Sequence, residues 1–469
     1  MSANTKSAQI IPIMMLLAVS ATLQFLPFLR GYHLTADDVL FQYYALTSPA
    51  GDWFITGWKT AIWKAKLGEF LSIPIMVYGN AGIDYLVVRV INILLFISSI
   101  AIFSLWLKRH FTAGFALVFI LLIISTIPLR FFHMPPTSYP FFPSIQIIVL
   151  VASLLAIKRQ GTLKIIAVLG CTLSMLSSEY TLLLGSALIL FELLRDMRRV
   201  SSLVTDSRVW VLICALAGHL IVRNIVGSGG YTSVSEGLDI QKISRVIYYH
   251  TINGTIFGPT SFPINFGSLE AMDYARSAIV SISAGMSAVL MMPYIRAFKA
   301  QASLFSIMTL AVLIVFALTV PIALLPKYQA WCTSPGACVY LESRYAGWAV
   351  ILIISAIAQR LIYKVHGIIP AVLISFFAFV TALQNSATAH EMDRSIEPWH
   401  SAKKALCENV GNWESFLQSD VAQSIPFHVT SERSRADYWS AWAGDVECEH
   451  TVFSPAIAWP GLIFRARTG

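Results

Sequence analysis

The chain has 469 residues, of which 56% are hydrophobic and only 12% charged, and its mean hydropathy is +0.68. Because soluble domains carry about a quarter charged residues, this composition excludes an ordinary soluble protein and indicates a polytopic protein of the lipid bilayer. The formal charge is +8, but the basic residues form short clusters between apolar runs. This pattern is typical of membrane topology and not of a nucleic-acid surface, so we expect no nucleic acid among the partners.

Apolar runs close to the ~20 residues needed to cross about 30 Å of hydrocarbon recur along the chain. In chain order they lie at about 9–28, 84–107, 111–128, 140–157, 163–178, 180–194, 208–226, 277–295, 302–325, 347–359 and 367–384. The sequence therefore predicts an all-α polytopic membrane protein with about 11 transmembrane helices.

The loops between these runs predict the orientation. The basic clusters fall on the side of Lys6 if the helices alternate, and they are Lys108-Arg109, Lys158-Arg159, Arg195 with Arg198-Arg199, Arg296 with Lys299, and Arg360 with Lys364. The positive-inside rule makes that side cytoplasmic. We therefore expect a cytoplasmic N-terminus and, with an odd number of helices, a C-terminus outside.

The polar chemistry is predicted to lie on the outer face. Residues 1–384 would form the transmembrane catalytic domain, with outer loops at 30–83, 129–140, 227–276 and 326–346. Glycines and prolines in the third loop predict irregular structure. The tail, 385–469, is polar and rich in tryptophan, and short alternating segments at 427–430 and 451–453 favour a small α+β domain outside the membrane.

The cysteines separate by topology. Cys171 and Cys214 fall in predicted helices, whereas the other four fall in segments placed outside, as suits an oxidising compartment such as the periplasm. We expect a Cys332–Cys338 disulfide across a Pro-Gly turn and a Cys407–Cys448 disulfide within the tail. A metal site is the alternative, but no His or Cys pair has zinc-like spacing.

Two adjacent carboxylates, Asp37 and Asp38, follow the first apolar run and are the candidate catalytic groups. If that run crosses the bilayer, they lie at its outer mouth, where a charge near lipid needs an explanation. A helix N-terminus is the compatible alternative, because early carboxylates complement the helix macrodipole and Thr35 or Asp37 would be an acceptable cap.

Arg344 opens the tenth apolar segment on the same face, next to Tyr345. A buried arginine needs a partner, so the alternatives are an ion pair with Glu342, snorkelling to headgroups, or an anionic ligand whose oxygens match the guanidinium fork. Glu179, between the fifth and sixth segments, would pair with such an arginine or orient a substrate.

The second outer loop is aromatic and rich in proline. His133 and Tyr139 are substrate-binding candidates there, although a lone histidine is more often a structural hydrogen-bonding group.

These features together resemble the glycosyltransferase C superfamily, which includes protein O-mannosyltransferases, the lipid A aminoarabinose transferase and bacterial and phage O-antigen glucosyltransferases. The matching residues are the acidic pair after helix one, Ser178-Glu179 between two middle helices, and Arg344-Tyr345 opening a late helix. The short tail departs from the larger family members and leaves the acceptor open.

The resemblance implies transfer of a sugar from a polyprenyl-phosphate donor to a glycan acceptor at the periplasmic face of a bacterial inner membrane, with lipopolysaccharide O-antigen as the nearest example. It implies that Asp37 or Asp38 is the base and that Arg344, with Tyr345, binds the donor phosphate. The second Asp would orient the first, hold the acceptor or bind a divalent cation, and no other cofactor is expected. Direct displacement with a single base would invert the anomeric centre.

Two other classes compete with this interpretation. A transporter or lipid-linked sugar flippase would show internal hydropathy repeats and helices broken at mid-membrane, and the sequence shows no such repeat. A structural protein would explain the tail but not the acidic pair. An O-antigen polymerase or ligase shares the lipid-linked substrates and differs in moving a whole oligosaccharide.

Overall fold

The computed structural model describes residues 3–29, 36–64, 68–83, 85–129, 134–196, 204–226, 239–258, 266–297, 302–334, 338–364, 368–408, 416, 418–420 and 439–440. Over these residues the regular structure is helical and contains no strand.

The helices in chain order are α1 (Ala3–Phe25), η1 (Leu26–Leu29), α2 (Ala36–Thr47), α3 (Ala50–Lys64), α4 (Glu69–Ala81), α5 (Leu86–His110), α6 (Ala113–Thr126), α7 (Phe142–Ala156), α8 (Thr162–Ser177), α9 (Glu179–Asp196), α10 (Ser207–Val226), α11 (Ile240–Asn253), η3 (Phe266–Ser268), α12 (Ala271–Ala297), α13 (Leu304–Ala323), α14 (Pro326–Trp331), α15 (Leu341–Lys364) and α16 (Ile368–Glu408).

Each of the predicted apolar runs coincides with one of these helices. Among the described residues, 6 candidate spans are long and apolar enough to cross a membrane, and they lie in α1 with η1, α5, α12, α13, α15 and α16. Shorter apolar segments lie in α6, α7, α8 and α10. The chain is therefore an all-α, multi-pass membrane protein.

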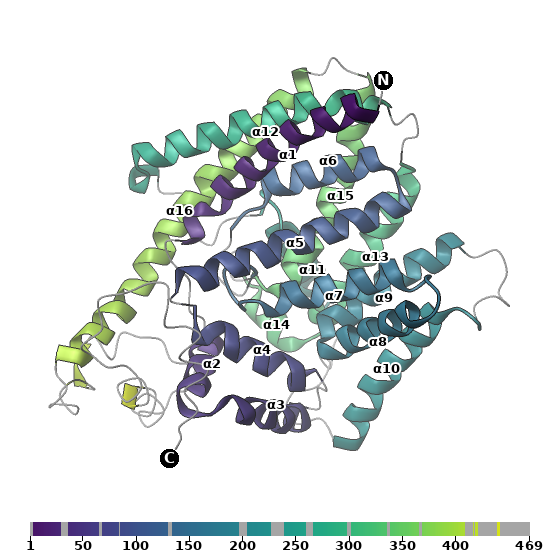
Figure 1. The fold of residues 1–469 in the computed structure, drawn as a ribbon. Coiled ribbons are helices and arrows are strands. Elements are labelled where there is room, and N and C mark those ends of the chain that lie inside the picture. The colour runs from purple at the N-terminus through teal and green to yellow at the C-terminus, as the bar shows by residue number, and fades with distance from the viewer. Residues whose placement is uncertain are drawn as a thin grey trace.

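The long helices pack as neighbours in a single bundle. Figure 1 shows α1, α12 and α16 side by side along one edge, and α12 contacts both α1 and α16 extensively. α13 packs on α15 and on α9, while α8 packs between α7 and α10. Exposed leucine, isoleucine and phenylalanine side chains on these helices suit contact with lipid.

The outer loops contain more helix than the sequence predicted. The first loop forms the three helices α2, α3 and α4. The expectation of irregular structure in 227–276 is wrong over 240–253, where α11 forms. Asp239 caps α11 through a 3.1 Å hydrogen bond from the amide of Lys242. Val246 and His250 lie four residues apart on its buried face, a helical spacing that outweighs the flanking glycines and prolines.

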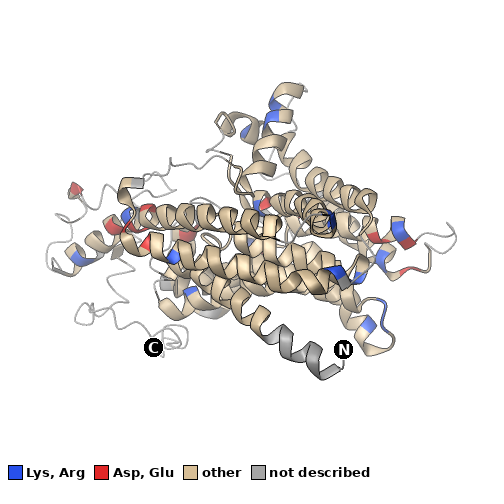
Figure 2. Ribbon diagram, turned by 90° about the horizontal axis from the view of Figure 1, so that it is seen from above, with Lys and Arg blue, Asp and Glu red and all other residues tan. Residues whose placement is uncertain are grey.

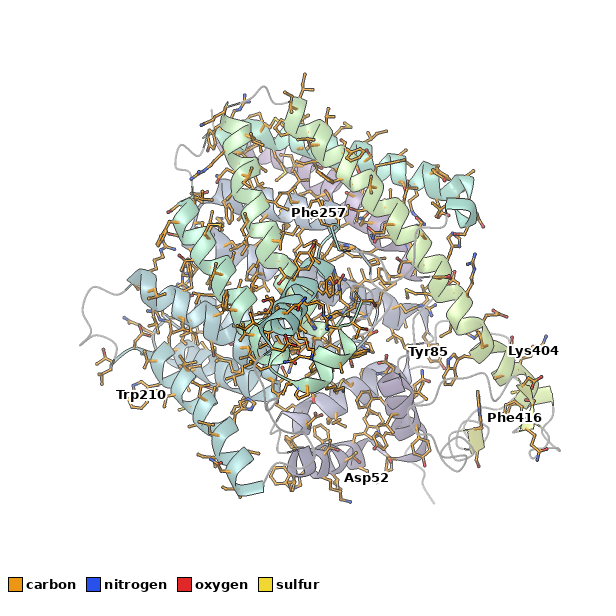
Figure 3. The ribbon with its side chains drawn as sticks, turned by 180° about the vertical axis from the view of Figure 1, so that it is seen from behind. Asp52, Tyr85, Trp210, Phe257, Lys404 and Phe416 are labelled. Atoms are coloured by element: carbon orange, nitrogen blue, oxygen red, sulfur yellow. A yellow bond between two sulfur atoms is a disulfide. The ribbon has the colours of Figure 1, made fainter. Side chains whose placement is uncertain are left out.

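The tail continues directly from the bundle, because α16 runs through the expected boundary at 384 and 385 as far as Glu408. The two segments expected to be strands lie outside the described residues. Trp399 on α16 and Trp439 lie 5.9 Å apart between ring centroids. Phe416 and Tyr85 belong to the same cluster, beside the far part of α16 (Figure 3). The described part of the tail therefore packs against the start of α5.

The bundle has two chemically different ends. The first, which we name the loop end, holds the connection from α6 to α7 and the start of α15. The second, the basic end, holds the last turns of α5 and α9 and the start of α10. Charged residues lie mostly toward the ends of the helices (Figure 2).

Candidate functional site

The connection between α6 and α7, residues 127–141, is the centre of the loop end, and we name it the proline loop. Its described residues, 127–129 and 134–141, are buried although they are not helical. The Pro135–Pro136 peptide is cis, and Tyr139 and Phe141 have positive φ angles of 56° and 68°. Buried backbone away from a helix needs other hydrogen-bonding partners, particularly inside a membrane.

Arg344 supplies two of these partners from the first turn of α15. Its side chain is 0% exposed. Nε donates to the carbonyl of Pro135 at 2.8 Å and Nη2 donates to the carbonyl of Pro128 at 2.8 Å. The guanidinium carbon also lies 5.8 Å from the centroid of the Phe96 ring. Arg344 therefore bridges the two limbs of the proline loop, an arrangement that was not among the alternatives drawn from the sequence.

Two asparagines bind the same loop. Asn92 on α5 donates through Nδ2 to the carbonyl of Pro136 at 2.9 Å and accepts at Oδ1 from the amide of Phe141 at 3.0 Å. Asn385 on α16 accepts at Oδ1 from the amide of Leu129 at 2.7 Å. Sequence reasoning missed both, although a lone Asn in an apolar helix is itself a signal, because polar groups in membrane helices are rare and have partners.

Tyr345 forms an aromatic layer beside Arg344. Its ring stacks on Tyr180 with 5.6 Å between centroids and 2° between planes, and it meets Trp348 edge-on at 5.1 Å. The hydroxyl of Tyr180 donates to the carbonyl of Pro143 at 3.2 Å, just past the proline loop. Glu179, the residue before Tyr180, is exposed at the start of α9. Glu179 and Tyr345 are thus brought to the same end of the bundle.

The acidic pair lies in the first turn of α2, which begins at Ala36. The side chain of Asp38 is fully buried, and its neighbour Val39 packs in a cluster with Phe141 of the proline loop. The position in a first helical turn agrees with the helix-start interpretation, and burial of a carboxylate agrees with the catalytic one. The side chain of Asp37 lies outside the described residues.

The remaining candidate residues are Tyr139, Glu342 and His133. Tyr139 is buried within the proline loop, and Glu342 is half-buried in the first turn of α15. His133 lies outside the described residues. Thus the described candidates from the first, second and last outer loops share one end of the bundle.

The Cys332–Cys338 disulfide is confirmed, with 4.7 Å between the Cα atoms. Cys407 is also disulfide-bonded, and its expected partner Cys448 lies outside the described residues. His250 on α11 lies against the first disulfide, with Nε2 3.8 Å from the sulfur of Cys332. These two cysteines and His250 are spaced closely enough to hold a metal ion, but sulfurs joined in a disulfide are not thiolate ligands.

His250 also connects this disulfide to the start of α15. Its Nδ1 lies 2.9 Å from the hydroxyl of Ser343, the residue before Arg344. The imidazole is buried against the Tyr328 ring, and this burial lowers the pKa of His250 to about 4. His250 is therefore neutral at pH 7 in the folded protein.

A second polar cluster at the loop end joins α12 to α16. Asp273 accepts from Arg276 Nη2 at 2.8 Å, and His390 Nε2 lies 2.8 Å from its other oxygen. Arg276 also donates to the hydroxyl of Ser386. Asp273 is buried, and sequence reasoning missed it, because its partner on α16 is far away in the chain.

The basic end holds a buried ionic network centred on Glu192 of α9, which is 0% exposed. Its Oε1 accepts from Trp106 Nε1 at 2.8 Å and lies 2.9 Å from His110 Nε2. Its Oε2 lies 2.9 Å from Arg208 Nη1. Three helices, α5, α9 and α10, are thereby joined through one carboxylate.

Arg208 extends this network toward solvent. It pairs with Asp196 at 2.7 Å and with Asp206, to which Nε donates at 3.0 Å and Nη2 at 2.5 Å. Partial burial alone would raise the pKa of Asp206, but the hydrogen bonds from Arg208 outweigh it and the pKa is lowered. Asp206 is therefore ionised at neutral pH.

Comparison with known families, with curated proteins and with solved structures gives no match to this chain. The function of this chain is therefore inferred from its own residues.

Proposed function

We propose that this protein is an integral membrane glycosyltransferase that moves a hexose, such as glucose, from a polyprenyl-phosphate donor to a periplasmic glycan such as lipopolysaccharide O-antigen. One observation supports it: candidates chosen from separate stretches of sequence gather at the loop end. They are Asp38, Tyr139, Glu179, Glu342, Arg344 and Tyr345.

The chemistry needs one base and one cation. A carboxylate of the acidic pair would take the proton of the acceptor hydroxyl as that oxygen attacks the anomeric carbon, and the polyprenyl phosphate would leave with inversion. The departing phosphate is stabilised by positive charge, which Arg344 supplies in a low-dielectric environment. Arg344 has a second role here, because its bonds to Pro128 and Pro135 hold the proline loop in shape.

The proposal includes a topology. The 11 apolar helices would cross a bacterial inner membrane, with the basic end in the cytoplasm and residues 385–469 as a periplasmic α+β domain. The Cys332–Cys338 disulfide supports this orientation, because Asn253 donates to the carbonyl of Cys338 at 2.7 Å and Ser343 lies beside His250, so the disulfide belongs to the loop end. Disulfides persist in oxidising compartments such as the periplasm. A reporter fused near residue 400 that reads as cytoplasmic would overturn this topology.

The direct test is sugar transfer by reconstituted protein supplied with labelled polyprenyl-phosphate glucose and O-antigen acceptor. We expect Asp37→Asn or Asp38→Asn to insert normally and to lower the transfer rate by about 10²–10⁴-fold, the usual contribution of a positioned base. Asp52→Asn is the matched control, because Asp52 lies in the same outer segment but is exposed on α3. If both Asn variants transfer at the wild-type rate, the acidic pair serves only the start of α2.

The same preparation distinguishes the competing classes. A flippase would move the labelled lipid between leaflets without forming a new glycosidic bond, and it would do so without acceptor. A polymerase would transfer an oligosaccharide from a lipid diphosphate and would leave the monosaccharide donor unused. Formation of a single-residue product only when donor and acceptor are both present supports the transferase.

A further inference from the structure

The basic end contains a hollow that the proposed transfer reaction does not use. It has a volume of about 490 Å³ and lies between the C-terminal ends of α5 and α7. Its lining consists of Arg109, Leu155, Lys158 and Arg159. Three of these four side chains are cations, so the hollow is suited to an anion.

The cations are held to different degrees. Arg109 Nη1 donates to the carbonyl of Leu155 at 2.6 Å, which fixes the guanidinium against the end of α7. Lys158, 43% exposed, pairs with Asp196. Arg159 is exposed and has no ion pair among the described residues. Within the described part of the chain, Asp196 is the one carboxylate that pairs with any of these three cations, so the hollow stays positive.

The ionic network around Glu192 is connected to the hollow through Lys158. Lys158 is bonded to Asp196, Asp196 to Arg208, and Arg208 to the fully buried Glu192. A cation held in this way loses less side-chain freedom when it binds a ligand, which favours affinity. The hollow is therefore a supported site and not only a set of mobile surface charges.

The surroundings point to a ligand attached to lipid. Leu155 gives the hollow one apolar wall. The adjoining helix α8 begins at Thr162 and exposes Leu163 and Ile166, each 59% exposed, as expected of a surface that meets hydrocarbon. We propose that this hollow binds the phosphate headgroup of an anionic phospholipid at the membrane surface. A free phosphate shares the charge chemistry but gains nothing from the apolar wall.

The test titrates the purified full-length protein in an uncharged detergent with phosphatidylglycerol or phosphatidylcholine and follows the Tm. Phosphatidylglycerol should raise the Tm and phosphatidylcholine should not. A basic residue near a membrane surface contributes about 1 kcal/mol, or about five-fold in affinity. We therefore expect Arg159→Gln to require about five-fold more phosphatidylglycerol, and the Lys158→Gln/Arg159→Gln double variant about thirty-fold more.

Lys164→Gln is the matched control, because Lys164 is exposed on α8 near the same end but does not line the hollow. Its titration should match wild type. Equal weakening by Lys164→Gln and Arg159→Gln would overturn the proposal in favour of diffuse surface charge. Because Arg159→Gln leaves the Lys158–Asp196 pair intact, its effect does not arise from collapse of the network.

Inorganic phosphate, titrated in parallel, separates the two sources of the anion. The lipid assignment is supported if phosphate at the same concentrations leaves the Tm unchanged. It is overturned if phosphate stabilises wild type as strongly as phosphatidylglycerol and the double variant loses that effect, or if the two phospholipids act alike.

Discussion

The loop end and the basic end each bury an arginine almost completely inside an apolar bundle, but the two arginines have different hydrogen-bonding partners. At the loop end, Arg344 binds two neutral backbone carbonyls. At the basic end, Arg208 binds three carboxylates.

The stability of the loop end should therefore depend on the geometry of the arginine side chain, and that of the basic end on its charge. Two carbonyls held at fixed positions need the guanidinium fork, because a single ammonium group presents its donors from one point. A carboxylate network depends instead on charge balance, since removing one partner leaves its counterion buried without compensation. The two ends should therefore respond differently to the same kinds of substitution.

The largest effect is expected at the basic end. Glu192→Ala removes the acceptor shared by Trp106, His110 and Arg208, and losing one partner of a buried ion pair typically lowers the free energy of unfolding by about 3–5 kcal/mol. Thermal or denaturant unfolding in detergent measures this loss. Asp239→Asn is the control, because asparagine still caps α11 and the pair with Lys242 that is lost is exposed, so the unfolding midpoint should stay unchanged. Equal behaviour of the two variants would contradict the charge-balance account.

A smaller loss of unfolding free energy is expected at the loop end when a substitution keeps the positive charge of Arg344. Arg344→Lys cannot reproduce both carbonyl bonds, and each lost buried hydrogen bond lowers the free energy of unfolding by about 1–3 kcal/mol. Arg344→Ala should lose more, because the contact with Phe96 also disappears. In the transfer assay, Lys should lower donor use partially and Ala severely. Arg360→Lys, at the opposite end of α15, is the control for replacing an arginine by a lysine in this helix. A wild-type midpoint for Arg344→Lys would show that charge alone suffices.

The smallest effect concerns pH at the loop end. The pKa of His250 is about 4 when folded and about 6.5 when unfolded, so the unfolded chain binds more protons between these values. Stability is then lost as the pH falls through this window, by about 1 kcal/mol between pH 7 and pH 5.5 for this group. The comparison of wild type with His250→Gln at both pH values isolates it. Its contacts Ser343 and Tyr328 do not titrate there. An unchanged pH response in His250→Gln would exclude His250 as the source.

Local patterns in the sequence predicted much of the fold. Run length identified the apolar helices, because crossing hydrocarbon requires continuous apolar residues. The spacing of Cys332 and Cys338 across a turn predicted their disulfide, which is a short-range contact. The helix α11 was missed because the flanking Gly and Pro residues received more weight than the buried spacing of Val246 and His250.

The partners within the site could not be predicted in this way. The sequence indicated that Arg344 needs a partner, but Pro128 and Pro135 lie more than two hundred residues earlier. The same holds for Asn385 and Leu129. A carbonyl has no residue-specific signature in a sequence, so only the assembled bundle identifies which backbone groups a side chain binds.

The side chains that bind the proline loop are synthesised at different times, and this determines when the loop can be buried during membrane insertion. Asn92, 44 residues before Pro136, is already synthesised when the loop emerges. Arg344 and Asn385 follow more than two hundred residues later, and at about 5–20 residues per second the ribosome needs about 10–40 seconds to reach the first of them. Until then the carbonyls that these side chains will bind need water or other temporary partners, because hydrocarbon offers none. Burial of the loop is therefore completed only after the last two long helices of the bundle, α15 and α16, have been made.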